Sequence, residues 1–530
     1  MYDILIKNAR VIDGTGKPAF QANVAVKDGR IVAIGAALDG EAADTLDAAG
    51  LVLSPGFVDP HTHSDITLLV DPLAQSKIRQ GVTTEIFGNC GSSYAPLMGA
   101  ALTETKNELE PLGFEVTWKD FAAYLDLFRQ KGIAQNVVAL AGHNIIRACV
   151  CGYDDVQPTP EQQAAMERLT AEAMEQGVHG LSTGLYYPPG FYAKTEEVIG
   201  LARGVAQYGG VYASHIRSES DTLFESIEEA IEIGRRSGAQ VQISHLKLEG
   251  WHNFKGADRV LEMIENANQE GLAVGCDQYP YDASSTWLGA ILPNWAQAGG
   301  VQAVANRAKD PATRALLKQD YIDHRIDWEN RGGVISWDQI LVVDVTNRAD
   351  VVGKNIQQIA EIDGKDPLDT LLDLIAVSGG SASAVWFDQL EDNVQYLMKY
   401  PRLCTGSDGV ALSTDGFLGT ILTHPRSYGT FPRVLGRYVR ELKILPLEEA
   451  IRKMTSQPAA YFKLKDRGVI REGAWADIVL FSLAEIGGRA DFADPLRPPA
   501  GMAFVMVNGT IVVENTVIPG GTPGCILKRT

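Results

Sequence analysis

The chain has 530 residues, of which 45% are apolar and 21% are charged, and its formal net charge is −19. This composition is typical of a globular chain that buries a large core, and the length favours more than one domain. The acidity argues against nucleic acid or an anionic membrane as a partner, and no apolar run approaches the roughly 18 residues of a membrane span. We therefore expect a protein that acts on a small molecule.

The first residues also favour a cytoplasmic protein. Asp3 and Lys7 are charged, and no apolar stretch of a secretory signal follows them. Six cysteines are too few for a disulfide framework in a chain of this length. We expect a reducing, cytoplasmic location.

Both ends of the chain are rich in short strand patterns. Residues 4–12 and 24–34 are separated by turn signals, and residues 476–481, 501–507 and 510–513 look similar, with Asn508-Gly509 as a hairpin turn. These ends predict one small β-sandwich domain built from residues 1–54 and 464–530. Two unrelated β appendages are the alternative.

The middle of the chain, residues 55–463, changes character after Ser54-Pro55-Gly56. Strands are expected at 82–87, 137–141, 180–185, 211–214, 241–244 and 272–276, and helices at 161–176, 195–208, 221–238 and 256–270. This order predicts a parallel sheet, and polar residues directly after the strands favour a (β/α)8 barrel of the TIM type. A doubly wound sheet is the alternative.

Residues 293–400 do not continue the alternation of strand and helix. A polar helix is expected at 303–325 and a turn at Arg331-Gly332-Gly333. We interpret part of this stretch as an insertion or lid in the C-terminal half of the barrel.

Four histidines stand at the ends of predicted strands. His61 and His63 are two residues apart on an extended segment, so both side chains point the same way. His215 and His245 each follow an apolar run and lie one strand–helix unit apart, which predicts neighbouring strands. Imidazoles grouped in this way favour a metal site of the zinc type, whereas surface or core histidines are the alternative for each one alone.

Cys90 and Asp408 also follow apolar segments. A cysteine thiolate is a strong zinc ligand, although a single buried cysteine is more often structural. A carboxylate opposite a metal, as expected for Asp408, can act as a general base, although Asp408-Gly409 also fits a simple turn. His143 and His424 are further candidates for the pocket.

One motif matches a catalytic pattern that the surrounding residues do not support. Residues 180–184 match the Gly-x-Ser-x-Gly pattern of serine hydrolases, which requires a helix directly after the serine. Pro188 and Pro189 follow instead and oppose such a helix.

Taken in order, these motifs resemble the amidohydrolase superfamily, and within it the D-aminoacylase (N-acyl-D-amino-acid deacylase) family. The resemblance rests on residues 55–63 (PGFVDPHTH), 88–91 (GNCG), 406–409 (GSDG), 424–433 (HPRSYGTFPR) and 474–479 (AWADIV), together with His215 and His245. A cysteine at position 90 is the more specific feature, because many relatives have a lysine or glutamate there. The resemblance runs nearly from end to end.

The resemblance implies a (β/α)8 barrel with a terminal β-sandwich and the hydrolysis of a linear amide. It implies one tight zinc held by Cys90, His215 and His245, and a second, weaker metal position at His61 and His63. Asp408 would be the catalytic base and acid, and Lys247, Tyr187 and Arg426 would bind the substrate carboxylate. The substrate would be an N-acyl-D-amino acid, with D-stereochemistry implied by the resemblance alone.

Two alternatives remain at this point. A cyclic-amide hydrolase of the hydantoinase or dihydroorotase type would share the fold, although Cys90 in place of a bridging lysine argues against it. A non-catalytic barrel that only binds a ligand is the other, although every ligand position and Asp408 are filled. The oligomeric state is left open.

The side-chain preference is judged from residues 279–292, which resemble the pocket strand of the family. Members that prefer acidic side chains have an arginine near its end. This chain has Ala290 and Ile291 there and no basic residue from 280 to 301. We expect an apolar or broad preference.

Overall fold

The computed structural model describes residues 1–325, 327–328, 333–334 and 336–529. In this part of the chain, eight parallel strands form a barrel. β8 and β9 count as one of these strands, which is interrupted at Leu140. The barrel strands are β6 (Phe57–Asp59), β7 (Val82–Phe87), β8 (Asn136–Ala139), β9 (Ala141–Gly142), β10 (Gly180–Gly184), β11 (Val211–His215), β12 (Gln240–Ile243), β13 (Val274–Gln278) and β17 (Leu403–Thr405).

The barrel is closed by a contact beyond its first and last strands. Hydrogen bonds join β6-β7-β8 and β9-β10-β11-β12-β13-β17 in those orders. A parallel bridge between Thr62 and Gly409 links the segment after β6 to the segment after β17. The predicted (β/α)8 barrel is confirmed, with β13 two residues later than expected, so that Asp277 lies inside the strand.

Helices cover the outside of the barrel, which is why its strands are buried on both faces. They are α1 (Thr67–Val70), α2 (Gln75–Ile78), α3 (Gly99–Leu109), α4 (Phe121–Lys131), α5 (His143–Cys151), α6 (Pro160–Glu175), α7 (Thr195–Gln207), α8 (Leu223–Ser237), α9 (Ala257–Gln269), α16 (Glu391–Met398), α17 (Arg426–Arg433), α18 (Leu447–Met454) and α19 (Ser456–Tyr461). In α8, Leu223, Ile227 and Ile231 recur every four residues and are buried against the strands.

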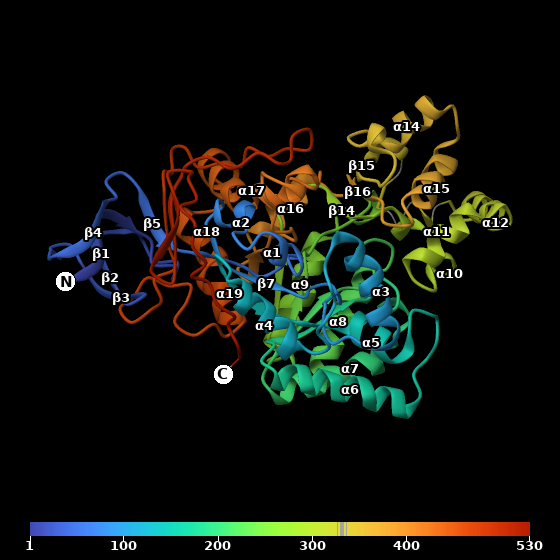
Figure 1. Cartoon of the computed structure of the whole chain (residues 1–530), viewed down its shortest axis with the longest axis horizontal. Coiled ribbons are helices and arrows are strands. Elements are labelled where there is room, and N and C mark those ends of the chain that lie inside the picture. The colour runs from blue at the N-terminus through green and yellow to red at the C-terminus, as the bar shows by residue number, and fades with distance from the viewer. Residues whose placement is uncertain (326, 329–332, 335, 530) are drawn as a thin grey trace.

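The two ends of the chain share one mixed sheet. Its strands are β1 (Tyr2–Val11), β2 (Phe20–Lys27), β3 (Arg30–Gly35), β4 (Ala42–Asp47), β5 (Val52–Pro55), β18 (Ile478–Phe481), β19 (Met502–Val507) and β20 (Thr510–Glu514). The order is β20-β19-β18-β5-β1-β2-β3, with β4 paired to β1. β18 pairs antiparallel with β5, so the C-terminal strands (red) lie beside the N-terminal ones (blue) in Figure 1. Ile6, Val24 and Leu480 belong to one apolar cluster of this sheet.

The chain between β13 and β17 forms a unit with its own apolar core, which includes Leu288, Leu371 and Trp386. Its described residues contain the sheet β14-β16-β15 and several helices, and the unit projects from one side of the barrel (Figure 1). The elements are β14 (Ser284–Trp287), α10 (Asn294–Gln297), α11 (Val301–Lys309), α12 (Pro311–Asp323), β15 (Ile340–Asp344), α14 (Ile356–Asp363), α15 (Pro367–Val377) and β16 (Ser383–Trp386).

The prediction of a single helix over residues 303–325 is wrong. The chain forms α11 and α12 there, because Asp310 caps the second helix by accepting a hydrogen bond from the Thr313 amide and Pro311 occupies its first position. Of the expected turn, Arg331 and Gly332 lie outside the described residues. Among the described helices, none is long and apolar enough to cross a bilayer.

Candidate active site

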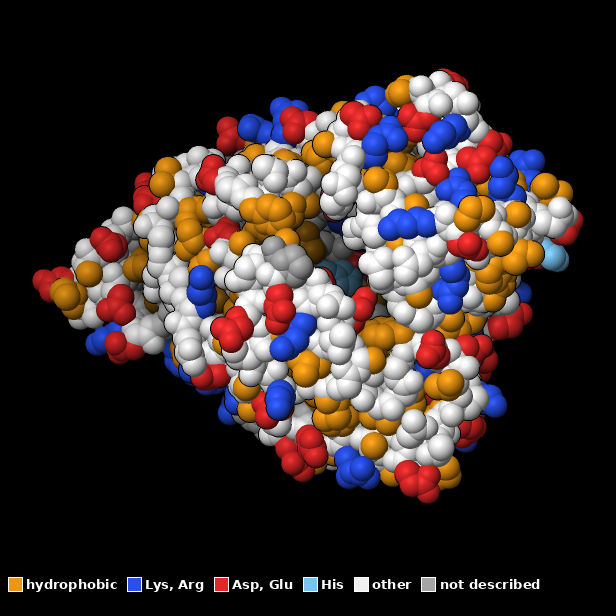
Figure 2. All heavy atoms as spheres, turned by 45° about the vertical axis from the view of Figure 1, so that its right-hand side comes forward, with side chains coloured by type: hydrophobic (Ala, Val, Ile, Leu, Met, Phe, Trp, Pro, Cys, Tyr) orange, Lys and Arg blue, Asp and Glu red, His pale blue; other side chains and the backbone are white. Residues whose placement is uncertain are grey.

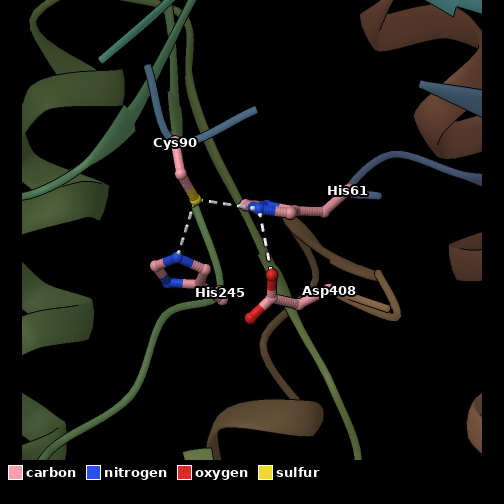
Figure 3. A group of neighbouring side chains, drawn as sticks. All are labelled: His61, Cys90, His245 and Asp408. Carbon is pink, nitrogen blue, oxygen red and sulfur yellow. Dashed lines mark hydrogen bonds and ion pairs between the residues drawn. The ribbon is translucent and has the colours of Figure 1, made fainter. Parts of the chain in front are cut away.

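Four side chains with metal-binding atoms meet beyond the carboxyl ends of four barrel strands (Figure 3). They are His61 after β6, Cys90 after β7, His245 after β12 and Asp408 after β17, and their ligand atoms all lie within 4.8 Å of one another. Sγ of Cys90 lies 3.3 Å from Nε2 of His61 and 3.3 Å from Nε2 of His245. A thiolate with imidazole nitrogens is a donor set that zinc prefers, so the residues present fit this metal.

The backbone turns sharply at three of these residues. Cys90, His245 and Asp408 have positive φ angles of 52°, 35° and 50°, which are uncommon outside glycine. Gly91 follows Cys90 with φ +72°, and a Cβ there would lie 2.2 Å from Oδ1 of Asn144. The strained turns direct the side chains into a common centre, as is frequent at functional sites.

Carboxylates fix the orientation of two of the imidazoles. Oδ1 of Asp277 lies 3.2 Å from Nδ1 of His61, and Oε1 of Glu219 lies 2.9 Å from Nδ1 of His245. In both rings Nε2 is thereby left to face Cys90. This is the arrangement of metal-binding histidines, whose second nitrogen is held by a carboxylate.

A second group of metal-type atoms lies beside the first and shares His245 with it. His215, Glu219 and His245 have ligand atoms within 4.8 Å of one another. The rings of His215 and His245 are 4.4 Å apart between centroids, and Nε2 of His215 lies 3.6 Å from Oε2 of Glu219. His63 lies on the other side, with Nε2 3.0 Å from Oδ1 of Asp408. The structure thus brings all five predicted ligand residues to one region.

The charges of the site favour a thiolate at Cys90. Burial raises the pKa of the Cys90 thiol, but the charges of His61 and His245 outweigh burial and hold this pKa well below its usual range. The thiolate is the form that binds a metal.

Asp408 is held as a carboxylate. Burial raises the pKa of Asp408. The guanidinium of Arg426 and the imidazoles of His245 and His61 lower it by more, so the pKa lies well below its usual range. Nη1 of Arg426 lies 2.8 Å from Oδ2 of Asp408. Asp408 is therefore in the deprotonated form that a general base requires.

A cavity of about 470 Å³ opens over the site. Figure 2 shows the hollow between the barrel and the inserted unit, with a pale blue histidine inside it. Of the predicted residues, those that line it are His63, Cys90, Tyr187, His215, His245, Lys247, Asp408 and Arg426. His61 is wholly buried and does not line the cavity.

The three residues predicted to bind a substrate carboxylate are already in contact with protein groups. Nζ of Lys247 lies 2.6 Å from Oε2 of Glu219. The Tyr187 hydroxyl lies 2.9 Å from Oγ1 of Thr286. Arg426 and Lys247 flank the ring of Tyr279, at 4.9 Å and 5.8 Å from its centroid. The two cations therefore lie on one side of the cavity.

Other residues singled out from the sequence lie elsewhere. His143 begins α5 and contacts Oε1 of Glu197 at 2.9 Å, and it does not line the cavity. His424 contacts the carbonyl of Ala283 and accepts a hydrogen bond from the amide of Arg426, and it does not line the cavity. Ser182, the serine of the Gly-x-Ser-x-Gly motif, accepts a hydrogen bond from the amide of Gly91 and donates one to the carbonyl of Gly88. It therefore supports the loop that carries Cys90.

Sequence reasoning missed Glu219 and Asp277. Asp277 had a signal, since an acidic residue at the end of a predicted buried strand is unusual. Glu219 lies in the loop between β11 and α8, where a carboxylate four residues after a histidine is common and carries little information.

Comparison with known proteins gives consistent similarity along the whole chain. The profile of the Amidohydrolase family matches residues 44–513. A D-aminoacylase of Alcaligenes xylosoxydans xylosoxydans is 35% identical over 529 residues, which cover 100% of this chain and 98% of the relative. An N-acyl-D-glutamate deacylase of the same organism is 35% identical, and the similar region covers 99% of this chain and 96% of that relative. The crystal structure of N-acyl-D-glutamate deacylase from Bordetella bronchiseptica, with zinc and a phosphonate inhibitor, has a TM-score of 0.84 at 33% identity and covers 99% of both chains.

Proposed function

The chain belongs to the Amidohydrolase family, and we propose that it is a zinc-dependent hydrolase that cleaves the amide bond of N-acyl-D-amino acids to a carboxylate and a free D-amino acid. The full-length identity of 35% to a D-aminoacylase and to an N-acyl-D-glutamate deacylase supports this reaction. The observation that carries it to this chain is the group of Cys90, His245 and Asp408 at the floor of the cavity.

Cys90, His215 and His245 would hold the tight metal, and His61 with His63 would hold a second, weaker position. The Cys90 sulfur lies 3.3 Å from both His61 and His245, which supports its role at the centre of the set. When bound, zinc polarises the amide carbonyl and increases the acidity of water.

Asp408 would carry the proton of the reaction. Its carboxylate takes a proton from the attacking water and later donates it to the nitrogen of the leaving amine, so that no amide anion is expelled. Arg426 lowers the pKa of Asp408 and so keeps the carboxylate charged, which is the form that a proton acceptor must have.

Lys247, Arg426 and Tyr187 would hold the α-carboxylate of the substrate. The two cations flank Tyr279 on one side of the cavity, next to the metal-type residues. A carboxylate anchored there fixes the position of the adjacent amide, which lowers the entropic cost of reaching the reactive geometry. We propose an apolar or broad side-chain preference, because apolar groups such as Ile145 and Ile291 line much of the remaining wall.

The test is a chiral release assay on the zinc-loaded protein with racemic N-acetyl amino acids. We expect free D-methionine, D-leucine or D-phenylalanine and none of the L-enantiomers. If zinc is bound and neither enantiomer is released, the proposal fails. Hydrolysis of hydantoin or dihydroorotate by the same sample would then identify a cyclic-amide hydrolase.

A further inference from the structure

The lining of the cavity contains two groups of residues of different chemistry. Lys247 and Arg426, which both lie near the ring of Tyr279, belong to the group beside the metal-type residues. The other group, here called the side-chain lobe, consists of Glu104, Ile145, Tyr153, Ala290, Ile291 and Gln297. Resting on the function proposed above, we propose that this lobe binds a cationic side chain, so that N-acyl derivatives of D-lysine and D-ornithine are favoured substrates.

The side-chain lobe lies between the barrel and the inserted unit. Glu104 is on α3, Ile145 is on α5 and Gln297 ends α10. A Cβ placed on Gly300, just before α11, would lie 3.9 Å from Oε1 of Glu104 and 3.8 Å from Cγ of Tyr153. The Glu104 carboxylate is therefore close to the loop that follows Gln297.

The charge of the lobe is negative. Glu104 is half-buried and forms no ion pair with any residue that the structure describes. The cations that line the cavity, Lys247 and Arg426, are each paired to a carboxylate, at 2.6 Å and 2.8 Å. Arg307 of α11 donates to the carbonyls of Ala296 and Ala298 and does not line the cavity. An acidic side chain placed in the lobe would meet repulsion with no compensating cation.

Gln297 forms a fixed part of the wall of the lobe. Its side-chain nitrogen donates to the carbonyls of Ala290 at 3.3 Å and Leu292 at 2.6 Å, which fixes the orientation of the amide. Its oxygen is then left without a partner in the described part of the chain, in a residue that is only 2% exposed.

The walls of the lobe suit the stem of such a side chain. Ile145, Ile291 and Tyr153 add apolar surface to the lining of the same cavity as Glu104. Lysine buries its methylene groups along apolar surface while its charge reaches a polar group. A cationic side chain with an apolar stem falls within the broad preference proposed above and narrows it, whereas a purely apolar preference would exclude it.

The test compares three substrates of similar length on the zinc-loaded protein: N-acetyl-D-lysine, N-acetyl-D-norleucine and N-acetyl-D-glutamate. We expect kcat/KM for the lysine substrate to exceed that for the glutamate substrate by about tenfold or more. In Glu104→Gln, the ratio of kcat/KM for lysine to that for norleucine should fall by about threefold to tenfold. In Glu104→Lys, the ratio of glutamate to lysine should rise.

Glu108→Gln is the matched control, because Glu108 is on the same helix and contacts Tyr94 rather than the cavity. Its lysine-to-norleucine ratio should equal that of the unmodified protein. The lobe proposal is overturned if norleucine is released while glutamate is preferred to lysine, or if Glu104→Gln leaves the ratio unchanged. Release from none of the three substrates overturns the proposed function itself, and the lobe proposal with it.

Discussion

Oε1 of Glu219 lies 2.9 Å from Nδ1 of His245, on the side of the imidazole that faces away from Cys90. The other oxygen of the same carboxylate lies 2.6 Å from Nζ of Lys247. One buried side chain thus orients a proposed metal ligand and a proposed substrate contact at once. Loss of its charge should affect both metal binding and substrate binding.

We predict that Glu219→Gln lowers the affinity for zinc by about tenfold to a hundredfold, the usual cost of removing a carboxylate behind a ligating histidine. Competition with a chelator of known affinity measures the change. Glu225→Gln, on the exposed side of α8, is the control and should bind zinc as the unmodified protein does. Equal zinc affinity in Glu219→Gln would show that His245 needs no such support.

Removal of the thiol tests the metal site itself. We predict that Cys90→Ala retains less than half of the zinc per chain after dialysis against a weak chelator and loses activity in proportion, because a thiolate ligand is removed. Cys149→Ala is the control, since Cys149 is half-buried and its sulfur donates to the carbonyl of Pro96, away from the cavity. Full zinc and full activity in Cys90→Ala would contradict the proposed ligand set.

Arg426 can act on the substrate carboxylate or only on Asp408, and a substrate without the carboxylate separates these roles. We predict that Arg426→Met lowers kcat/KM for N-acetyl-D-methionine by about tenfold to a hundredfold, the value of a charge-assisted hydrogen bond. The fall should be much smaller for N-acetyl-3-(methylthio)propylamine, which lacks the carboxylate. Arg437→Met, at a residue outside the cavity, should leave kcat/KM unchanged for both substrates. Equal losses with both substrates would mean that Arg426 serves Asp408 alone.

Glu85 should make the stability of the fold depend on pH. It is fully buried on β7, accepts a hydrogen bond from the Ser64 hydroxyl at 3.0 Å and lies 3.9 Å from Nζ of Lys77. Burial raises its pKa from the usual 4.5 to about 7, despite the opposing charge of Lys77. Between these values the folded chain binds more protons than the unfolded one, so the free energy of unfolding falls as the pH rises from about 4.5 to about 7.

In the unmodified protein the free energy of unfolding should fall between pH 5 and pH 8. We predict that this fall is smaller by roughly 2 to 3 kcal/mol in Glu85→Gln, since each pKa unit is worth about 1.4 kcal/mol. Chemical denaturation of both proteins at the two pH values measures this difference. Glu172→Gln, an exposed position on α6, should leave the pH dependence as it is in the unmodified protein. A pH dependence of the same size in Glu85→Gln would show that Glu85 remains charged in the fold.

The sequence was most informative where strands end. The carboxyl ends of parallel strands meet at one edge, so a residue type and its place after a strand are sufficient to bring Cys90, His215 and His245 together. The same rule failed for His143, which also follows a strand. It begins α5 and turns toward Glu197 on α7, and only the path of the following helix decides that direction.

Contacts between distant segments could not be read from the sequence. Glu219 reaches His245 because the loop after β11 passes over the end of β12, and Gln297 reaches the cavity because the inserted unit packs beside α3 and α5. Neither of these contacts is accompanied by a recognisable pattern in the neighbouring sequence. The predicted helix at 303–325 is divided for a local reason, since Asp310-Pro311 is a strong start signal for a second helix.

The mixed terminal sheet has a consequence for how the chain folds during synthesis. The edge of β5 is completed only by β18, whose residues emerge from the ribosome roughly 420 positions later. Until then the backbone groups along that edge have no strand beside them, and an open edge is prone to pair with other chains. The barrel can gather its strands one after another, whereas the terminal sheet must wait until β18, β19 and β20 have been synthesised. Slow elongation and a high cellular concentration of nascent chains should therefore lower the yield of folded protein before any residue of the active site matters.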